Sequence, residues 1–328
     1  MNLLVTGGAG FIGSNFVRHM LDTYPNITIV NLDLLTYAGN LHSLVDLKEN
    51  PRHKFVHGSI TNRELVTHLL DVDNIDGIVN FAAESHVDRS IVNPGAFVET
   101  NVQGTLVLLE AAKIKGIGRF VHISTDEVYG SLDKTGYFTE DSPIAPNSPY
   151  AASKAASDML VRSYYKTYGL DVNITRCSKN YGPYQFPEKL MPLLITNGVD
   201  GGSLPVYGDG ENIRDWIHVK DHCAAIDLIL QKGKKGEVYN IGGRTEKTNN
   251  EIAQIIMKEL KLPEERLEYV KDRPGHDRRY AVNPEKLEKE LGWKSTYSFE
   301  AGMKETIDWY LSHEAWWRPL REKVQAVK

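Results

Sequence analysis

Cysteine is scarce in this chain: it occurs twice, at Cys177 and Cys223, in 328 residues of which 41% are hydrophobic and 25% charged. Neither cysteine belongs to a CxxC pair or has the cysteine and histidine spacing of a metal site. Both lie in apolar segments that are typical of buried strands or helices. We therefore predict two buried free thiols and no metal.

A long hydrophobic run is also missing. No apolar stretch approaches the roughly 20 residues that span a bilayer. Met1 leads straight into the apolar segment 3–5, which leaves no room for the basic segment and apolar core of a signal peptide. We expect no membrane partner and a cytoplasmic location.

The chain has no excess of positive charge. Its 38 Lys and Arg residues against 43 Asp and Glu residues give a net charge of -5. This balance argues against a nucleic-acid partner that is held by phosphate neutralisation, although basic residues could still converge locally on a diphosphate. The chain also lacks internal repeats and low-complexity segments, and its length suffices for two domains.

What the chain does contain starts with a strand, a glycine-rich loop and a helix. Residues 2–6 read as a buried parallel strand, the loop Gly7-Gly8-Ala9-Gly10-Phe11-Ile12-Gly13 follows at once, and apolar residues then recur at helical spacing. Glycine is needed where a side chain would keep the backbone from a dinucleotide diphosphate, which is held by N–H groups at the helix start. The pattern predicts a cofactor-binding loop.

Asp33 completes this pattern. It ends the second apolar strand, twenty residues after Gly13. Its carboxylate would accept hydrogen bonds from an adenosine ribose and repel a 2′-phosphate, which favours NAD over NADP. The plainer alternative is that Asp33 only begins the turn that runs to Thr36.

Strands and helices then alternate. Strand-like segments at 55–57, 77–83, 120–123 and 172–175 are separated by helical stretches at 61–70, 101–115 and 150–168. This alternation predicts an α/β fold with a doubly wound parallel sheet, a Rossmann domain, over residues 1–178. From residue 179 to 328, glycine and proline break the periodicity, which predicts a smaller, mixed second domain. We expect the strand at 214–219, the helix at 220–231 and the strand at 237–241 to return to the first domain.

Three polar residues stand together where the strand at 120–123 ends: Thr125, Asp126 and Glu127. In an open α/β sheet, ligands bind at the carboxyl ends of the strands. Two adjacent carboxyls in a pocket of low dielectric resist simultaneous ionisation, so one is held neutral. The alternative is that Thr-Asp-Glu is an ordinary N-terminal sequence of a helix.

A tyrosine and a lysine share a helix face further along the chain. Ser148 can cap a helix whose first residue is Pro149, and in that helix Tyr150 and Lys154 are four residues apart. A nearby ammonium and the positive end of a helix would lower the pKa of the phenol from its usual value near 10. Tyr150 is thus a candidate base for a sugar or alcohol hydroxyl, and a surface pair without a role is the alternative.

Two features stay open at this point. His86 follows the small residues Ala82 and Ala83, which would let a ligand approach, but we assign it no role. The segment 272–279 gathers cations in a Pro/Gly turn, which is either a solvated loop or a charge clamp beside a diphosphate.

Together these motifs closely resemble the extended short-chain dehydrogenase/reductase superfamily and, within it, the dTDP-glucose 4,6-dehydratases. The resemblance runs from the loop at 6–13 to the aromatic residues at 309–320, and its discriminating motif is Thr125-Asp126-Glu127-Val128-Tyr129-Gly130. It implies tightly bound NAD, dTDP-glucose as the substrate, a second domain that holds the nucleotide sugar, and a homodimer packed through the helices at 101–115 and 150–168. The implied reaction oxidises C4, removes water across C5 and C6 and returns the hydride to C6, in deoxysugar biosynthesis of the rhamnose type.

The resemblance also implies residue roles. Thr125 and Tyr150 contact the sugar, Lys154 contacts the nicotinamide ribose, Glu127 is the base at C5, and Asp126, in its protonated form, is the acid at C6. The implied cofactor contacts are Gly7, Gly10, Phe11, Ile12, Gly13, Asp33, Leu34, Thr36, Ser59, Ile60, Ala82, Ala83, Thr100, Tyr150, Lys154 and Asn180. The implied substrate contacts are Ser85, Thr125, Asn180, Glu188, Lys189, Leu190, Pro205, Val206, Tyr207, Arg214, Asn249, Arg273 and His276.

Two positions depart from the family pattern. Ser59 stands where an Asp that touches the adenine is usual, and Lys179 stands where Asn is usual. From Ser59 we expect a modest loss of cofactor affinity. From Lys179 we expect an added cation near the diphosphate, and we expect neither change to touch the catalytic residues.

Two other functions compete with the dehydratase. A nucleotide-sugar 4-epimerase returns the hydride to C4 and has no need of Asp126 and Glu127. A catalytically silent NAD-sensing protein would be expected to have lost Tyr150 or Lys154, and both are present. The residues alone do not distinguish thymidine from uridine.

Overall fold

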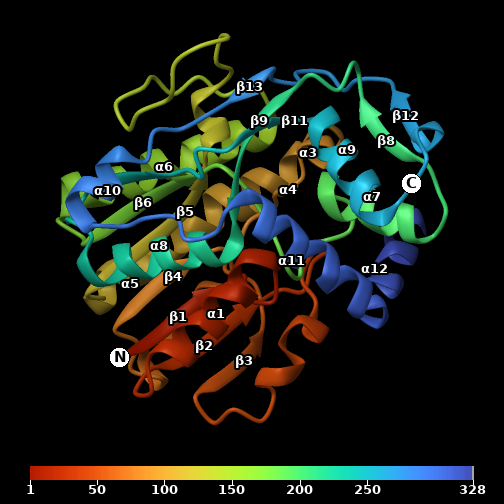
Figure 1. Cartoon of the computed structure of the whole chain (residues 1–328). Helices are drawn as coiled ribbons and strands as arrows, with labels where there is room; N and C mark the ends of the chain where they lie inside the picture. The colour runs from red at the N-terminus through yellow and green to blue at the C-terminus, as the bar shows by residue number, and fades with distance from the viewer. Residues whose placement is uncertain (327–328) are drawn as a thin grey trace.

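The computed structural model describes residues 1–326, with side chains through residue 322. Its largest element is a seven-stranded parallel sheet in the order β10-β6-β5-β4-β1-β2-β3 (Figure 1). The strands are β1 (Asn2–Thr6), β2 (Thr28–Asp33), β3 (His53–His57), β4 (Gly77–Asn80), β5 (Arg119–Thr125), β6 (Val172–Cys177) and β10 (Val238–Ile241). This strand order, in which the sheet grows outward from β1 in both directions, confirms the predicted doubly wound fold.

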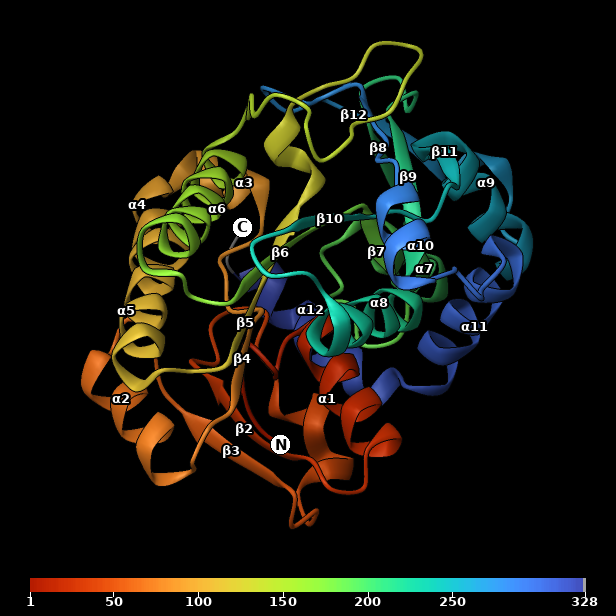
Figure 2. The ribbon, with the colours of Figure 1, turned by 90° about the vertical axis from the view of Figure 1, so that its left-hand side faces the viewer.

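Helices cover both faces of this sheet (Figure 2). One face carries α1 (Phe11–Thr23) and α8 (Val219–Lys232), and the other carries α2 (Arg63–Val72), α5 (Thr105–Lys115) and α6 (Pro149–Tyr168). Two hydrophobic cores result, one around Phe16 and Ile226 and one around Leu108 and Val161. Because the sheet is buried on both sides, its strands read as apolar runs rather than as alternating sequences.

The boundaries of α6 follow from local sequence. The Ser148 hydroxyl accepts a hydrogen bond from the Ala151 N–H, and Pro149 occupies the first position of the helix, as predicted. At the other end, Gly169 takes the left-handed conformation (φ 69°), which glycine adopts at low cost. This capping fixes where Tyr150 and Lys154 lie relative to the sheet.

The second lobe is built on two small sheets. In one, β9 (Ile213–His218) pairs with β7 (Lys179–Tyr181), β11 (Glu246–Thr248) and β13 (Arg279–Tyr280); in the other, β8 (Leu204–Tyr207) pairs with β12 (Leu267–Val270). Its helices are α7 (Leu190–Val199), α9 (Asn249–Leu260), α11 (Phe299–Ser312) and α12 (Glu314–Ala326). The remaining helices are η1 (Leu41–Leu47), α3 (Val87–Val92), α4 (Pro94–Phe97), the π-helical η2 (Val98–Gly104), η3 (Asp126–Tyr129), η4 (Glu264–Arg266) and α10 (Glu285–Leu291).

Of the three elements expected to return to the first domain, two do. Strand β10 pairs with β6 in the large sheet, and α8 packs against α1. The expectation for the strand at 214–219 was wrong, because β9 is the centre of the second lobe's sheet. An apolar run shows that a strand is buried but does not show which sheet contains it. The division of the chain at 178/179 stays a proposal.

Two smaller observations complete the fold. Cys177 and Cys223 are buried and unbonded, as predicted. Within the described residues, no helix has the length and apolar character that crossing a membrane requires.

Candidate active site

The carboxyl ends of the large sheet bring most of the predicted site residues to one edge. The loop at 7–13 follows β1, Asp33 ends β2, Ser59 follows β3, Ala82 follows β4, and η3 follows β5. All of these strands are parallel, so their ends face the same side of the sheet. The other predicted contacts lie as follows: Leu34 and Thr36 after β2, Ile60 after β3, Ala83 after β4, Thr100 in η2, and Asn180 in β7.

The glycine loop is tightly packed. Gly7 has a φ of 72°, and a Cβ on Gly13 would stand 2.3 Å from the Gly7 carbonyl oxygen. Helix α1 begins at Phe11, directly after Gly10, without a side chain that caps it. The N–H groups of its first turn are therefore not capped by a side chain, which fits a site for the diphosphate of a dinucleotide.

Asp33 begins the turn that the plainer alternative expected, and it also contacts the glycine loop. One carboxylate oxygen accepts a hydrogen bond from the Leu35 N–H at 2.8 Å, which starts the turn, and the other accepts from the Ala9 N–H at 2.9 Å, which ties β2 to the glycine loop. Burial raises its pKa. A hollow lined by Leu35, Thr36, Tyr37, Gly39, Asn40, Leu41 and His42 lies beside this turn. The ribose contact of Asp33 stays a prediction.

Asp126 and Glu127 are buried side by side in η3, with 0% and 6% of their surface exposed. Burial raises the pKa of Asp126 to about 6. Burial also acts to raise the pKa of Glu127, but the charge and hydrogen bond of Lys179 outweigh it, so that this pKa lies below its usual value. The pKa values of the two neighbours are thus moved in opposite directions, so that Asp126 keeps its proton to a higher pH than Glu127 does.

Tyr150 and Lys154 extend from α6 toward the same edge of the sheet. The Tyr150 ring packs edge-on against Phe97, with ring centres 6.2 Å apart, and the Lys154 ammonium donates to the Ile123 carbonyl at 2.7 Å. Burial raises the pKa of Tyr150 well above 10, the negative charge of Glu127 adds to this, and a hydrogen bond with Thr125 lowers it. Burial lowers the pKa of Lys154 to about 8.

The expected depression of the Tyr150 pKa is therefore wrong for the protein's own groups. The sequence argument weighed the lysine four residues away and the helix end, but it could not weigh desolvation or two carboxyls from another element. In the folded protein, burial and the negative charges of Glu127 and Asp126 raise the pKa of Tyr150.

The predicted substrate residues of the second lobe approach the first lobe through Asp88 of α3. The Tyr207 hydroxyl donates to Asp88 at 3.3 Å, and the Arg273 guanidinium lies 3.1 Å from it. His276 contacts Asp272 at 2.6 Å and lies edge-on to the Tyr207 ring. Asp88, which the sequence analysis did not identify, thus organises one wall of the site.

The remaining substrate candidates are placed as follows. The Lys189 ammonium donates to the Ser85 carbonyl at 3.4 Å, and Glu188 lies 3.7 Å from both His86 and Arg89. Leu190 begins α7, Pro205, Val206 and Tyr207 form β8, and Asn249 begins α9. The Val206 side chain packs into the core of the second lobe.

The basic segment 272–279 divides into two parts. Arg278 pairs with exposed Asp209, and Arg279 pairs with Glu246, so both stabilise the lobe itself. Arg273 pairs with Asp88. The guanidinium of Arg214 lies 4.5 Å from the centre of the Tyr280 ring. The charge clamp beside a diphosphate, one of the two interpretations of this segment, would therefore consist of Arg273 together with Arg214.

Asn101 of η2 is a positioning residue that the sequence analysis missed. Its carbonyl oxygen accepts from the Glu84 N–H at 2.8 Å, and its amide donates to the Glu84 carbonyl at 3.0 Å and to the Ser153 hydroxyl at 2.8 Å. It therefore ties the loop after β4 to the helix that carries Tyr150. A buried polar residue inside a helical stretch was the signal available in the sequence.

The expectation for Lys179 was wrong. Its ammonium forms an ion pair with Glu127 and lies 3.9 Å from Asp126, so this departure from the family pattern does touch the proposed catalytic residues. Lys179 is two residues past Cys177, which pairs in the sheet with Thr125. Strand register, which the sequence alone does not give, brings them together.

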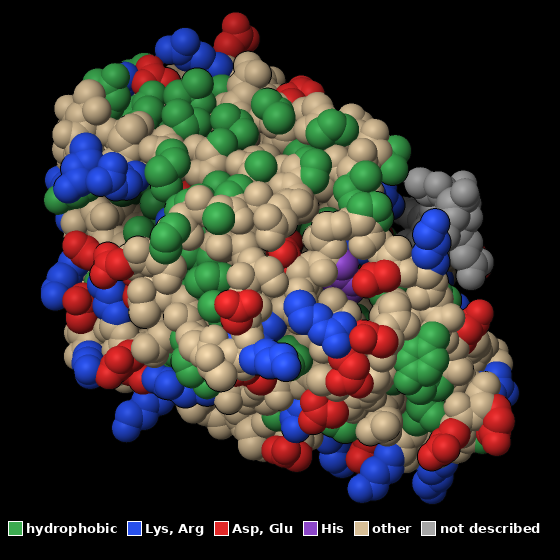
Figure 3. Space-filling model, turned by 90° about the horizontal axis from the view of Figure 1, so that it is seen from above, with side chains coloured by type: hydrophobic (Ala, Val, Ile, Leu, Met, Phe, Trp, Pro, Cys, Tyr) green, Lys and Arg blue, Asp and Glu red, His purple; other side chains and the backbone are tan. Residues whose placement is uncertain are grey.

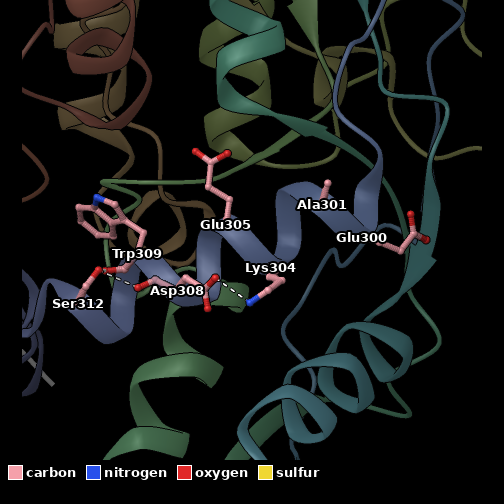
Figure 4. A pocket seen from close by; sticks show the side chains of 7 residues that line it. All are labelled: Glu300, Ala301, Lys304, Glu305, Asp308, Trp309 and Ser312. Carbon is pink, nitrogen blue, oxygen red and sulfur yellow. Dashed lines mark hydrogen bonds and ion pairs between the residues drawn. The ribbon is translucent and has the colours of Figure 1, made fainter.

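A separate hollow lies on α11 (Figure 4). None of the predicted site residues lines it, and Lys304 pairs with Asp308 across it at 2.8 Å. Its lining consists of Glu300, Ala301, Lys304, Glu305, Asp308, Trp309 and Ser312. We therefore place the site at the sheet edge and not on α11.

Known proteins resemble this chain over nearly its whole length. The model of the GDP-mannose 4,6 dehydratase family matches residues 4–306. A dTDP-glucose 4,6-dehydratase of Xanthomonas campestris pv. campestris (strain B100) is 55% identical, over 95% of this chain and 94% of the relative. The crystal structure of DesIV, a dTDP-glucose 4,6-dehydratase from Streptomyces venezuelae solved with NAD and TYD bound, is 54% identical with a TM-score of 0.95, over 98% and 100% of the two chains.

An epimerase is more distant. The UDP-glucose 4-epimerase of Thermotoga maritima, solved with UDP-glucose, has a TM-score of 0.89 but is 29% identical, over 95% of this chain and 99% of that one. The fold is thus shared across the superfamily, whereas sequence identity favours the dehydratases. The chain belongs to the GDP-mannose 4,6 dehydratase family of the extended short-chain dehydrogenases/reductases and, within it, to the dTDP-glucose 4,6-dehydratases.

Proposed function

We propose that this protein catalyses the NAD-dependent dehydration of dTDP-glucose to dTDP-4-keto-6-deoxyglucose. The observation that carries the proposal is the buried pair Asp126 and Glu127, whose surroundings raise the pKa of the first carboxyl and lower that of the second, as an acid and a base require. Elimination across C5 and C6 needs this combination, and a 4-epimerase does not. The high identity to dTDP-glucose 4,6-dehydratases supports the same substrate.

The glycine loop, Asp33 and Lys154 would hold NAD at the carboxyl ends of β1, β2 and β5. The chemistry that bound NAD supplies is acceptance of the C4 hydride and its later return to C6. Since one substrate lends the hydride and takes it back, the cofactor has no reason to leave between turnovers.

The protein's own groups move the protons. Tyr150 would take the C4 hydroxyl proton as the hydride departs, which leaves a ketone at C4. Because burial and Glu127 raise its pKa, this role requires a further positive charge, such as that of the oxidised nicotinamide, to favour the phenolate. The ketone acidifies the C5 hydrogen, and the Glu127 carboxylate removes that proton. Asp126 then donates its proton to the C6 hydroxyl, which leaves as water. Oδ2 of Asp126 is buried and has no hydrogen-bond partner within the described residues, so it is available to the substrate.

The C4 ketone is not reduced again, because the hydride goes to C6 of the C5–C6 double bond and a proton returns to C5. The product is one water lighter than the substrate and has the same oxidation level overall. Thr125, which hydrogen-bonds with Tyr150, would contact the sugar next to the same group.

Further parts of the proposal concern the whole protein. A homodimer through α5 and α6 is supported by apolar side chains that these helices leave exposed, among them Leu106 and Met159. The division into an NAD-binding domain and a nucleotide-sugar-binding domain is supported by the separate hydrophobic cores of the two lobes. The cytoplasmic location and the rhamnose-type pathway stay predictions.

The direct test is to incubate the purified protein with dTDP-glucose or UDP-glucose and to measure product masses. We expect loss of one water from dTDP-glucose without added NAD. A product of unchanged mass that is epimerised at C4 would replace this proposal with the epimerase alternative.

A further inference from the structure

Lys179 reaches the two residues on which the proposed elimination depends. Because Cys177 of β6 pairs with Thr125 of β5, the residues that follow each strand lie side by side. The Lys179 ammonium forms an ion pair with Oε1 of Glu127 and lies 3.9 Å from Oδ1 of Asp126. Within residues 1–322, Asp126 and Glu127 make no other ion pair shorter than 4.0 Å.

The lysine is held by more than this ion pair. Its backbone belongs to β7, where it pairs with Trp216 of β9, and its ammonium lies 5.1 Å from the centre of the Tyr280 ring. Its side chain is 27% exposed, so most of it is shielded from solvent. The direction of the ammonium is therefore set by the second lobe, while the carboxyl that it holds belongs to the first.

Other charged and titratable groups face Glu127 from the surrounding elements. They are Asp126, Tyr150, Lys189, Arg214, Arg273 and Tyr280. Arg214 and Arg273 act on Glu127 through space, whereas Lys179 also donates a hydrogen bond to it. A single ammonium that bonds one carboxyl and stands 3.9 Å from the other makes the pair asymmetric and favours the negative charge on Glu127.

We propose that Lys179 is a positioning residue that holds the Glu127 carboxylate ionised and in one orientation beside Asp126, the proposed acid. The inference rests on the proposed function, since it assigns a role within the dehydration. It replaces the role expected from the sequence, in which Lys179 adds a cation near the substrate diphosphate. The lowered pKa of Glu127, opposed by burial but depressed by Lys179, agrees with it.

The test compares Lys179→Met and Lys179→Asn with Lys179→Arg. Both neutral variants should move the acid limb of the pH profile for C5 proton exchange and for dehydration to higher pH by about one unit or more. Lys179→Arg should restore most of the native profile, because it keeps the charge. The affinity for dTDP should change by less than about threefold, a difference of about 0.7 kcal/mol. Lys304→Met, which removes a surface charge paired with Asp308, is the matched control and should leave the profile unchanged.

A titration without substrate separates this inference from the proposed function. In protein labelled with 13C at the glutamate carboxyls, the Glu127 resonance is assigned by its loss in Glu127→Gln, and its midpoint should rise in both neutral variants. An unchanged midpoint, or an unchanged pH profile together with dTDP binding weakened tenfold or more, overturns the inference and makes Lys179 a phosphate contact. Failure of the native protein to dehydrate dTDP-glucose overturns the proposed function, while the midpoint still decides the effect of Lys179 on Glu127.

Discussion

Asp126 and Glu127 are neighbours in the chain, yet their surroundings push their pKa values apart. Both are desolvated, but Lys179 bonds Glu127 and stands farther from Asp126. Desolvation of a lone carboxyl favours its neutral form, and an adjacent cation favours the charged one. In the proposed mechanism, the difference between acid and base therefore arises mainly from one ammonium and not from the residue types, since both groups are carboxyls of nearly equal intrinsic acidity.

The first prediction separates the two halves of the reaction. Glu127→Gln and Asp126→Asn keep the shapes of the side chains but remove the base or the acid, so both should block water loss while C4 oxidation persists. Absorbance of enzyme-bound NADH should then build up when dTDP-glucose is added, because the hydride has no acceptor at C6. The expected loss in dehydration is roughly two to four orders of magnitude, the usual range for one acid or base.

The two variants should differ in isotope exchange. Glu127→Gln should stop exchange of the C5 proton with deuterium from solvent, whereas Asp126→Asn should still allow it. With substrate deuterated at C4, the native protein should deliver the label to C6 of the same molecule. Near-native dehydration by Glu127→Gln, or return of the label to C4 alone, would rule out the assigned roles.

A second prediction concerns stability and pH. Asp126 has a pKa of about 6 in the folded protein against a usual value of 3.8, so the folded state retains its proton over a range in which the unfolded chain has lost it. Its contribution to stability is therefore full below about pH 4 and is lost as pH rises through about 6, by about 3 kcal/mol at most. Urea unfolding of the native protein and of Asp126→Asn from pH 4 to 7 measures this. The free-energy difference between them should change in favour of the variant as pH rises, and a constant difference would contradict it.

At the scale of elements, periodicity and capping were enough to predict the alternating strands and helices of the first domain. The start of α6 at Pro149 followed from Ser148, and the glycine loop was found because a strand precedes it and a helix follows it. The predictions that failed were those that depend on pairing between distant segments. The sheet that contains β9 and the contact between Lys179 and Glu127 are both set by strand register, and neither leaves a mark in local sequence.

Desolvation was the other effect that could not be predicted from the sequence. Tyr150 and Lys154 lie on one helix as predicted, but the shift of the Tyr150 pKa depends on how deeply the ring is buried and on Glu127, which belongs to another element. Asn101 was missed because its three hydrogen bonds join the loop after β4 to α6, two segments that are distant in the sequence. Spacing predicts neighbours along a helix, but not the partners that the fold brings from elsewhere.

The third prediction tests the junction of the loop and α1. Gly13→Ala would place a Cβ 2.3 Å from the Gly7 carbonyl oxygen, so the helix start must move away from the loop. We expect the variant to lose at least 90% of its copurified NAD, measured by absorbance after release in acid, and to be destabilised by about 1–3 kcal/mol. Gly95→Ala is the control, because the nearest atom to its Cβ would be 3.7 Å away. Full retention of NAD by Gly13→Ala would show that the loop does not need this close approach.

At the scale of the whole molecule, the protein presents two kinds of surface. Charged side chains of both signs are interspersed over much of the face in Figure 3, while hydrophobic ones gather toward its upper left. Helices α5 and α6 pack against each other, and together with η2 they leave Val98, Leu106 and Met159 exposed at 56%, 37% and 44%. Exposed apolar side chains that gather on adjacent helices are typical of an interaction surface.

The last prediction tests the proposed homodimer on these helices. A glutamate at the centre of an apolar interface would be desolvated without a partner, so Leu106→Glu and Met159→Glu should each shift the native dimer toward monomer. Sedimentation velocity at micromolar protein measures the shift, and we expect at least a tenfold weaker association. Leu311→Glu is the matched control, because Leu311 is also 44% exposed but lies on α11 of the second lobe. Since both helices also carry residues of the first lobe's core, circular dichroism must show that the variants keep their fold. A native protein that sediments as a monomer, or a Leu311→Glu variant that dissociates as readily as the other two, would place any subunit contact elsewhere.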